Sequence, residues 1–83
     1  MKYSIEISKQ AKKFIAKQQP RQQERLIEAI YRLPFEGDIK RMVGGEPYDY
    51  RLRVGDYRIL FERHDDRLVV VVINVGNRGD VYK

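Results

Sequence analysis

The sequence has no cysteine, no tryptophan and a single histidine. Without cysteine the chain forms no disulfide and no thiolate metal site, and one histidine argues against a structural zinc centre. The longest apolar run, Leu68–Ile73, is far shorter than the roughly 20 residues that span a bilayer. Charged residues interrupt the N-terminal segment where a signal peptide would be continuously apolar. We therefore expect a soluble cytoplasmic protein that does not associate with a membrane. We also expect it to bind no metal and no small-molecule cofactor.

Positive charge is what the chain has in excess. Its 83 residues include 17 Lys and Arg against 12 Asp and Glu, which gives a net charge of +5 and a pI near 9.6. A charge of this sign favours polyanionic partners, either nucleic acid or an acidic protein, although it also serves solubility. The length predicts one small domain, residues 1–83.

The first third of the chain reads as a strand followed by two helices. Alternation over Tyr3–Ile7 predicts a short strand, and Ser8 is a suitable N-cap for a helix that continues to about Lys17. Pro20 suits the first turn of a second helix, which Pro34 ends. The basic residues of both helices lie mostly off the apolar stripe, as is typical of a solvent-exposed face: Lys9, Lys12, Lys13, Lys17, Arg21, Arg25 and Arg32.

The segment Tyr48–Phe61 predicts a β-hairpin with Gly55-Asp56 as its two-residue turn. A direct turn predicts four facing pairs: Val54 with Tyr57, Arg53 with Arg58, Leu52 with Ile59, and Tyr50 with Phe61. One face is then apolar, and the other carries arginines. Since like charges on facing positions destabilise a sheet by up to about 1 kcal/mol, these arginines are candidates for binding an anion.

A second tight turn at Asp65-Asp66 predicts a further antiparallel strand. The expected facing pairs are Arg63 with Leu68, Phe61 with Val70, Ile59 with Val72, and Arg58 with Ile73. The apolar run Leu68–Ile73 predicts a strand covered on both faces, near the middle of the sheet, and Phe35–Pro47 is expected to be a loop. The order is therefore β-α-α-β-β-β. We predict an α+β fold with two N-terminal helices on one face of an antiparallel sheet.

Five residues are predicted to converge at one end of the open sheet face: Arg51, Arg53, Arg58, Arg78 and Tyr82. Guanidinium groups bind phosphate oxygens in pairs and stabilise the negative charge of a pentacoordinate transition state, so this cluster indicates phosphodiester recognition or cleavage. The alternative is that the arginines only solubilise the sheet and Tyr82 packs on its edge. Glu46 and Glu62 are weak candidates for a proton acceptor, and His64 is expected at the surface, far from Arg58.

The segments Tyr50–Phe61, Val71–Arg78 and Asp80–Tyr82 resemble the RelE toxins of the RelE/ParE toxin–antitoxin superfamily. The resemblance implies a ribosome-dependent endoribonuclease that cuts mRNA in the A site through the message's own 2′-hydroxyl, leaving a 2′,3′-cyclic phosphate. It also implies a cognate RelB-like antitoxin. Arg58 matches the arginine of the Gly-Tyr-Arg motif, Arg78 the arginine after Val-Gly-x, and Tyr82 the tyrosine near the C-terminus.

The resemblance places Arg51 and Arg53 where RelE proteins have basic residues, often lysine. Arginine stays protonated, so these two side chains supply charge but no proton acceptor. The base must then be Tyr82, a carboxylate or a group on the ribosome. Two other functions stay open: a ParE-like toxin that inhibits DNA gyrase through protein contact, and a basic RNA- or ribosome-binding module without catalysis.

Overall fold

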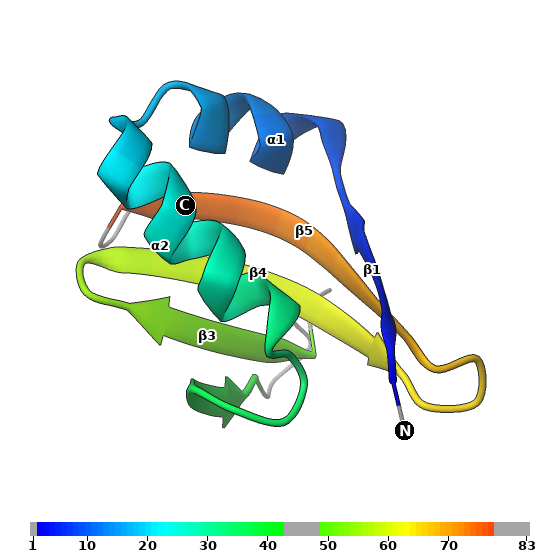
Figure 1. Cartoon of the computed structure of the whole chain (residues 1–83). Helices are drawn as coiled ribbons and strands as arrows, with labels where there is room; N and C mark the ends of the chain where they lie inside the picture. The colour runs from blue at the N-terminus through cyan, green and yellow to red at the C-terminus, as the bar shows by residue number, and fades with distance from the viewer. Residues whose placement is uncertain (1, 43–48, 78–83) are drawn as a thin grey trace.

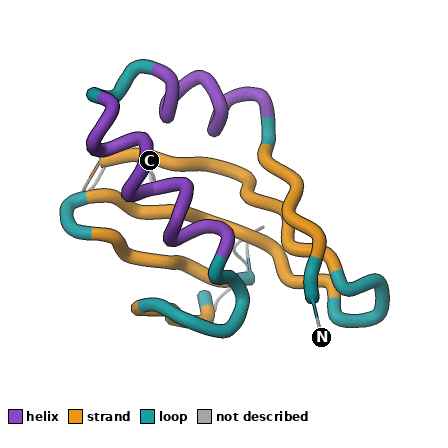
Figure 2. The backbone as a smooth tube through the Cα atoms, viewed as in Figure 1, coloured by secondary structure: helices purple, strands orange, loops and turns teal. Residues whose placement is uncertain are grey.

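The computed structural model describes residues 2–42 and 49–77, which form two helices over a five-stranded sheet (Figure 1). The elements in chain order are β1 (Ser4–Ile7), α1 (Lys9–Ala16), α2 (Pro20–Tyr31), β2 (Asp38–Arg41), β3 (Tyr50–Val54), β4 (Tyr57–His64) and β5 (Val69–Asn77). The spatial order of the strands is β1-β5-β4-β3-β2. Both helices lie on one face of the sheet (Figure 2), which confirms the predicted α+β fold. In the described part of the chain, no helix is long and apolar enough to cross a membrane.

Both helices begin where the sequence indicates. The Ser8 hydroxyl accepts a hydrogen bond from the Ala11 amide (3.1 Å) and donates one to the Ile73 carbonyl in β5 (2.6 Å). This N-cap therefore also fixes α1 to the sheet. Pro20 occupies the first position of α2, where its missing N–H costs no helical hydrogen bond.

The core lies between the helix layer and one face of the sheet. Its buried members on the helices and the turn after α2 are Ala11, Ile15, Leu26, Ile30 and Leu33. Its buried members on the strands are Leu52, Ile59, Phe61, Val70, Val72 and Val75. These residues occupy the expected apolar stripes of the helices and every second position of the central strands. The apolar faces of the helices and the sheet therefore pack against one another, and the arginines of β3 and β4 lie on the opposite face of the sheet.

The β3–β4 hairpin has the predicted register, with Arg53 opposite Arg58 and Leu52 opposite Ile59. Gly55 in the turn has φ +57°, a conformation that glycine adopts without strain. A methyl group there would also lie 2.9 Å from Nη2 of Arg25, which comes from α2. The end of the flexible Arg25 side chain can move away, so the positive φ is the stronger reason for glycine at this position.

The prediction of a loop over Phe35–Pro47 is wrong at Asp38–Arg41, which forms the edge strand β2. This strand has four residues, and Ile39 is the one apolar side chain among them. Edge strands are commonly short and charged, so they give almost no period-2 hydrophobic signal. Residues 43–47 of the expected loop lie outside the described residues.

The predicted register between β4 and β5 is also wrong. The observed pairs are Arg63 with Val70, Phe61 with Val72, Ile59 with Val75, and Arg58 with Gly76. The turn takes in Asp65 to Leu68, with Leu68 at φ +53°, so the pairing is shifted by two residues. A bulge at Leu60/Phe61 shifts it by one more. Val75 consequently lies opposite Ile59 in the core, with 2% of its surface exposed.

The first strand pairs in parallel with the last one, and Ile5 faces Val70. A cluster of side chains fixes the start of β1 to the β4–β5 turn. The Tyr3 hydroxyl donates a hydrogen bond to Asp65 (2.7 Å), and Arg63 Nε lies 2.6 Å from the same carboxylate oxygen.

The strand β5 lies between β1 and β4, so it is internal to the sheet, as predicted. Its exposure alternates: Val70 and Val72 are buried, whereas Val69 and Val71 are half-buried.

Candidate functional site

The sheet face that points away from the helices carries four basic residues at one end: Lys40 on β2, Arg51 and Arg53 on β3, and Arg58 on β4. Alternation puts them there, because Leu52 between the two β3 arginines is buried against the helices at 1% exposure. Lys40 lies opposite Arg51, and Arg53 lies opposite Arg58. The structure therefore brings together the three described arginines that the sequence predicted for one face. We call this group, with Lys40, the arginine cluster.

Asp38 of β2 is the carboxylate that contacts the cluster. Its Oδ2 lies 3.0 Å from Arg53 Nε, and its Oδ1 lies 3.6 Å from Arg51 Nη2. One carboxylate thus contacts two guanidinium groups. Within residues 2–42 and 49–77, it is the one carboxylate that forms an ion pair with any of the four cations. Sequence reasoning missed Asp38 and Lys40, because both belong to the strand that was expected to be a loop.

Arg51 is more enclosed than Arg53: 15% of the Arg51 side chain is exposed, compared with 51% of the Arg53 side chain. The Nε of Arg51 is buried, and among the described residues it has no hydrogen-bond acceptor. Leu60, directly opposite on β4, is only 1% exposed. A buried donor without an acceptor costs about 1–3 kcal/mol, so the fold keeps Arg51 enclosed at some cost in stability.

Arg58 is held differently. Its neighbours across the two ladders are Arg53 and Gly76, so one side offers a like charge and the other offers no side chain. No carboxylate of residues 2–42 or 49–77 forms an ion pair with it. Among the described residues, the guanidinium of Arg58 is therefore not neutralised by a carboxylate.

Two of the predicted site residues, Arg78 and Tyr82, lie outside the described residues, as does Glu46. The last described residue of β5, Asn77, pairs with Tyr57, next to Arg58. The chain up to Asn77 therefore ends at the arginine end of the sheet.

Glu62 and His64 lie on the same strand and the same face as Arg58, toward the other end of β4. His64 Nε2 is 2.9 Å from Glu62 Oε1, and each side chain is about one-third exposed. At about 3.3 Å per residue, Glu62 lies roughly 13 Å and His64 roughly 20 Å along the strand from Arg58. The predicted separation of His64 from Arg58 is thus confirmed, and Glu62 is occupied by the imidazole.

A groove of about 610 Å³ lies elsewhere, between the start of β1 and the end of α2. Tyr31 and Phe35 line it and are 61% and 62% exposed. None of the predicted site residues lines this groove. The arginine cluster is instead an open, charged surface, which suits a polymer better than a small enclosed ligand.

The fold matches solved toxin structures. A chain of the archaeal RelE–RelB complex from Pyrococcus horikoshii OT3 superposes with a TM-score of 0.80 at 26% identity, covering 96% of this chain and 99% of that one. The isolated Escherichia coli RelE toxin gives a TM-score of 0.69 at 25% identity, covering 96% and 90%. A chain of the RelBE2 complex from Mycobacterium tuberculosis shares the fold, with a TM-score of 0.80 at 23% identity over 94% and 100%. No curated protein sequence matches this chain.

These structures define the class of protein as a RelE-like toxin fold, as the sequence motifs implied. The family follows from the sequence: residues 5–82 match the ParE toxin of the type II toxin–antitoxin system parDE. The chain belongs to this family and is a toxin of the RelE/ParE superfamily.

Proposed function

We propose that this toxin is a metal-independent endoribonuclease that cleaves mRNA in the ribosomal A site. The observation that carries the proposal is that Arg51, Arg53 and Arg58 share one face of the sheet, with Arg58 in no ion pair within the described residues. Three guanidinium groups on one sheet face suit a phosphodiester, because each presents paired donors to phosphate oxygens.

In the proposed reaction the 2′-hydroxyl of the message attacks the adjacent phosphorus. Its proton passes to a base, the O2′–P bond forms, and the P–O5′ bond breaks as the leaving oxygen takes up a proton. The products are a 2′,3′-cyclic phosphate and a 5′-hydroxyl. Arg58 and Arg78 would bind the phosphate oxygens, while Arg51 and Arg53 would supply positive field to the pentacoordinate transition state.

The proton acceptor is assigned by chemistry. The arginines stay protonated at any physiological pH, and Glu62 lies too far along β4 to reach a phosphate bound at Arg58. Tyr82, Glu46 or a ribosomal group is then the acceptor. If the acceptor is a ribosomal group, cleavage would require the ribosome.

A cognate antitoxin is the second proposed partner. The similar RelE chains from Pyrococcus horikoshii and Mycobacterium tuberculosis occur in complexes with RelB proteins. A net charge of +5 suits an acidic antitoxin segment. By analogy, we infer a RelB-like protein that masks this toxin.

The test compares programmed ribosomes with naked RNA. Wild-type protein should cut mRNA only on the ribosome, and Arg58→Ala should lower the single-turnover cleavage rate by about 10²- to 10³-fold, the usual loss for one transition-state donor. The readout is the position and the 2′,3′-cyclic end of the cut message.

Arg67→Ala is the matched control, because Arg67 is exposed in the β4–β5 turn at the far end of the sheet. It should cleave at the wild-type rate. Absence of cleavage by wild-type protein on ribosomes, or equal rates for the two variants, would exclude the proposal. Ribosome footprinting without loss of mRNA would instead identify a non-catalytic binding module.

The family match to ParE favours one alternative, a toxin that acts on DNA gyrase without chemistry. A supercoiling assay separates the two functions. Gyrase inhibition by both wild-type protein and Arg58→Ala, with translation intact, would establish the ParE-like function.

A further inference from the structure

The net charge of the molecule is confined to one segment. Residues 7–23 contain five cations and no carboxylate, namely Lys9, Lys12, Lys13, Lys17 and Arg21. The whole chain has 17 basic and 12 acidic residues, so the remainder has 12 of each and no net charge. All five side chains are exposed. They belong to the helix layer, on the opposite side of the sheet from the arginine cluster.

The arrangement is unfavourable for the isolated helix. Lys9, Lys13 and Lys17 follow one another at intervals of four residues, where like charges repel by about 0.2–0.5 kcal/mol per pair. Lys9 and Lys12 also lie in the first turn of α1, where the helix dipole favours carboxylates and none is present. No ion pair in the described parts of the chain offsets these charges. The helix dipole favours Lys13 and Lys17 at the C-terminal end of α1, but the fold still keeps repelling lysines at four-residue spacing without a carboxylate between them.

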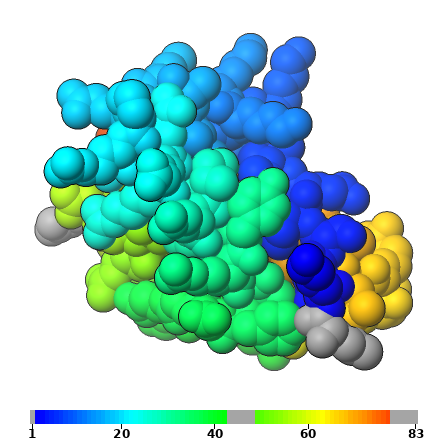
Figure 3. All heavy atoms as spheres, in the orientation of Figure 1, coloured from blue at the N-terminus to red at the C-terminus, as the bar shows by residue number. Residues whose placement is uncertain are grey.

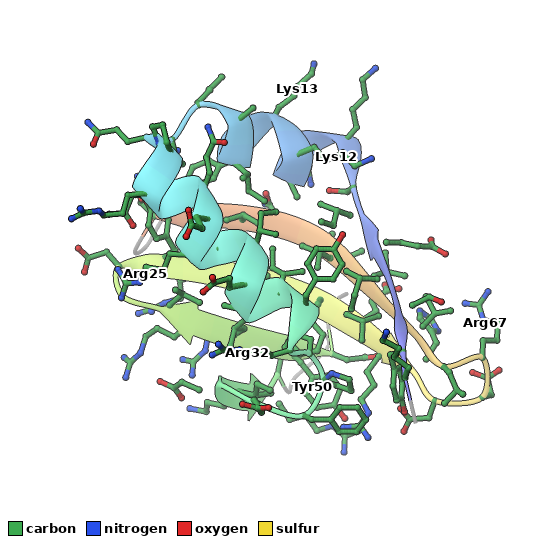
Figure 4. The ribbon with its side chains drawn as sticks, viewed as in Figure 1. Lys12, Lys13, Arg25, Arg32, Tyr50 and Arg67 are labelled. Atoms are coloured by element: carbon green, nitrogen blue, oxygen red, sulfur yellow. The ribbon has the colours of Figure 1, made fainter. Side chains whose placement is uncertain are left out.

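The chemistry of this surface suits phosphate better than protein. Figure 4 places Lys12 and Lys13 on α1, and Figure 3 shows long side chains of this segment projecting outward from the molecule. Protein interfaces are depleted in lysine and depend on aromatic anchors. In the described part of the chain, the exposed large aromatic residues lie instead at the other end of α2, where Tyr31 is its last residue, and in the turn that follows, at Phe35. A ridge from Lys9 to Lys17 is about 12 Å long, enough to follow several phosphates of one strand.

We infer that the lysine ridge (Lys9, Lys12, Lys13 and Lys17) is a second RNA-binding surface, which docks the toxin on the phosphate backbone of base-paired ribosomal RNA. The opposite face is thereby left free for the message. The ribosome as target comes from the proposed function, and the assignment rests on it. Each lysine contacts phosphate as a point charge, so the ridge supplies affinity without sequence preference.

The experiment measures binding to vacant 70S ribosomes, without mRNA, as a function of salt. Changing all four lysines to Gln should weaken binding by roughly tenfold or more near 0.1 M salt and lower the slope of log K against log salt by about 3 to 4, since each phosphate contact contributes about 0.9. Changing the same four residues to Arg should preserve both values. A 16-base-pair RNA hairpin should show the same order of affinities.

The matched control changes Lys2, Arg32, Arg41 and Arg67 to Gln, which also lowers the net charge from +5 to +1. These four side chains are exposed and lie outside both the ridge and the arginine cluster. Their loss should alter the salt slope by less than about 1. Equal weakening in the two quadruple variants would overturn the inference, and so would loss of antitoxin binding with ribosome binding intact.

Because no message is present, this result is independent of catalysis. Ribosome binding through the ridge by a toxin that never cuts mRNA would support the surface and exclude the proposed nuclease. Circular dichroism melting checks the fold. The Gln variant should melt at or above the wild-type temperature, because lysine repulsion is removed.

Discussion

At the scale of single residues, Asp38 determines how the arginine cluster presents itself. It contacts Arg51 and Arg53 and is itself about half exposed, so it acts more on charge and geometry than on stability. A cluster of guanidinium groups without this carboxylate would repel itself more strongly and bind anions more tightly. We therefore expect Asp38 to limit the affinity of the proposed site for phosphate.

This role gives a direct prediction. Asp38→Asn should tighten binding of a short single-stranded RNA by about two- to fivefold at low salt, with a change in unfolding free energy below about 1 kcal/mol. The difference should disappear near 0.5 M salt. Fluorescence anisotropy gives the affinities, and Glu28→Gln, an equal charge change on the exposed side of α2, is the control. Weaker binding by Asp38→Asn would mean that Asp38 orients the arginines for RNA.

At the scale of elements, β1 is fixed to the β4–β5 turn through an exposed ionisable cluster. A hydrogen bond from Tyr3 and then the nearby Arg63 lower the pKa of the Asp65 carboxyl, and the same hydrogen bond raises the pKa of the Tyr3 hydroxyl. A carboxyl group whose pKa is lower in the folded state than in the unfolded state stabilises the folded state at pH values above the ordinary pKa of about 3.9. The contribution is lost as the pH falls through the folded-state pKa.

We therefore expect Asp65→Asn to melt at a lower temperature than wild type at pH 7. The gap between the two melting temperatures should narrow as the pH falls below about 4 and should close once Asp65 is protonated in the folded wild type. Asp66→Asn, exposed in the same turn, should follow wild type throughout. A gap that stays constant down to pH 2 would show that the charge of Asp65 contributes nothing.

The strand pairings of this sheet differ in how far they can be predicted from the sequence. The β3–β4 hairpin was predictable in full, because Gly55 defines the turn and alternation on both sides then fixes Arg53 opposite Arg58. The β4–β5 register was not predictable. A leucine such as Leu68 gives no indication of a positive φ, and a bulge has no characteristic hydrophobic pattern. The shared face of Arg51, Arg53 and Arg58 followed from the hairpin alone. The contact of Asp38 with the arginines could not be predicted, because a four-residue edge strand is too short to show the alternating pattern of a strand.

At the scale of the whole molecule, the small core makes each buried contact important. Ile59 is fully buried on the central strand β4, between Leu52 and Val75 on the neighbouring strands. Domains of this size have a free energy of unfolding near the lower end of about 5–15 kcal/mol. One large cavity can therefore remove a substantial part of the stability.

Ile59→Ala should lower the free energy of unfolding by about 2–5 kcal/mol in urea titrations followed by circular dichroism. Tyr31→Ala removes a larger side chain that is 61% exposed, and it should change the free energy by less than about 1 kcal/mol. A similar loss for the two variants would show that Tyr31 belongs to the folded core.

The parallel pairing of β1 with β5 has a consequence for synthesis. The Ser8 hydroxyl reaches the carbonyl of Ile73, a partner 65 positions later in the chain. During translation the N-terminal strand and the helices emerge long before this partner exists, so the sheet closes only after Val69–Asn77 has left the exit tunnel. Until that strand has emerged, the ribosome that makes the toxin therefore holds it as an incomplete sheet in which β1 has no strand to pair with.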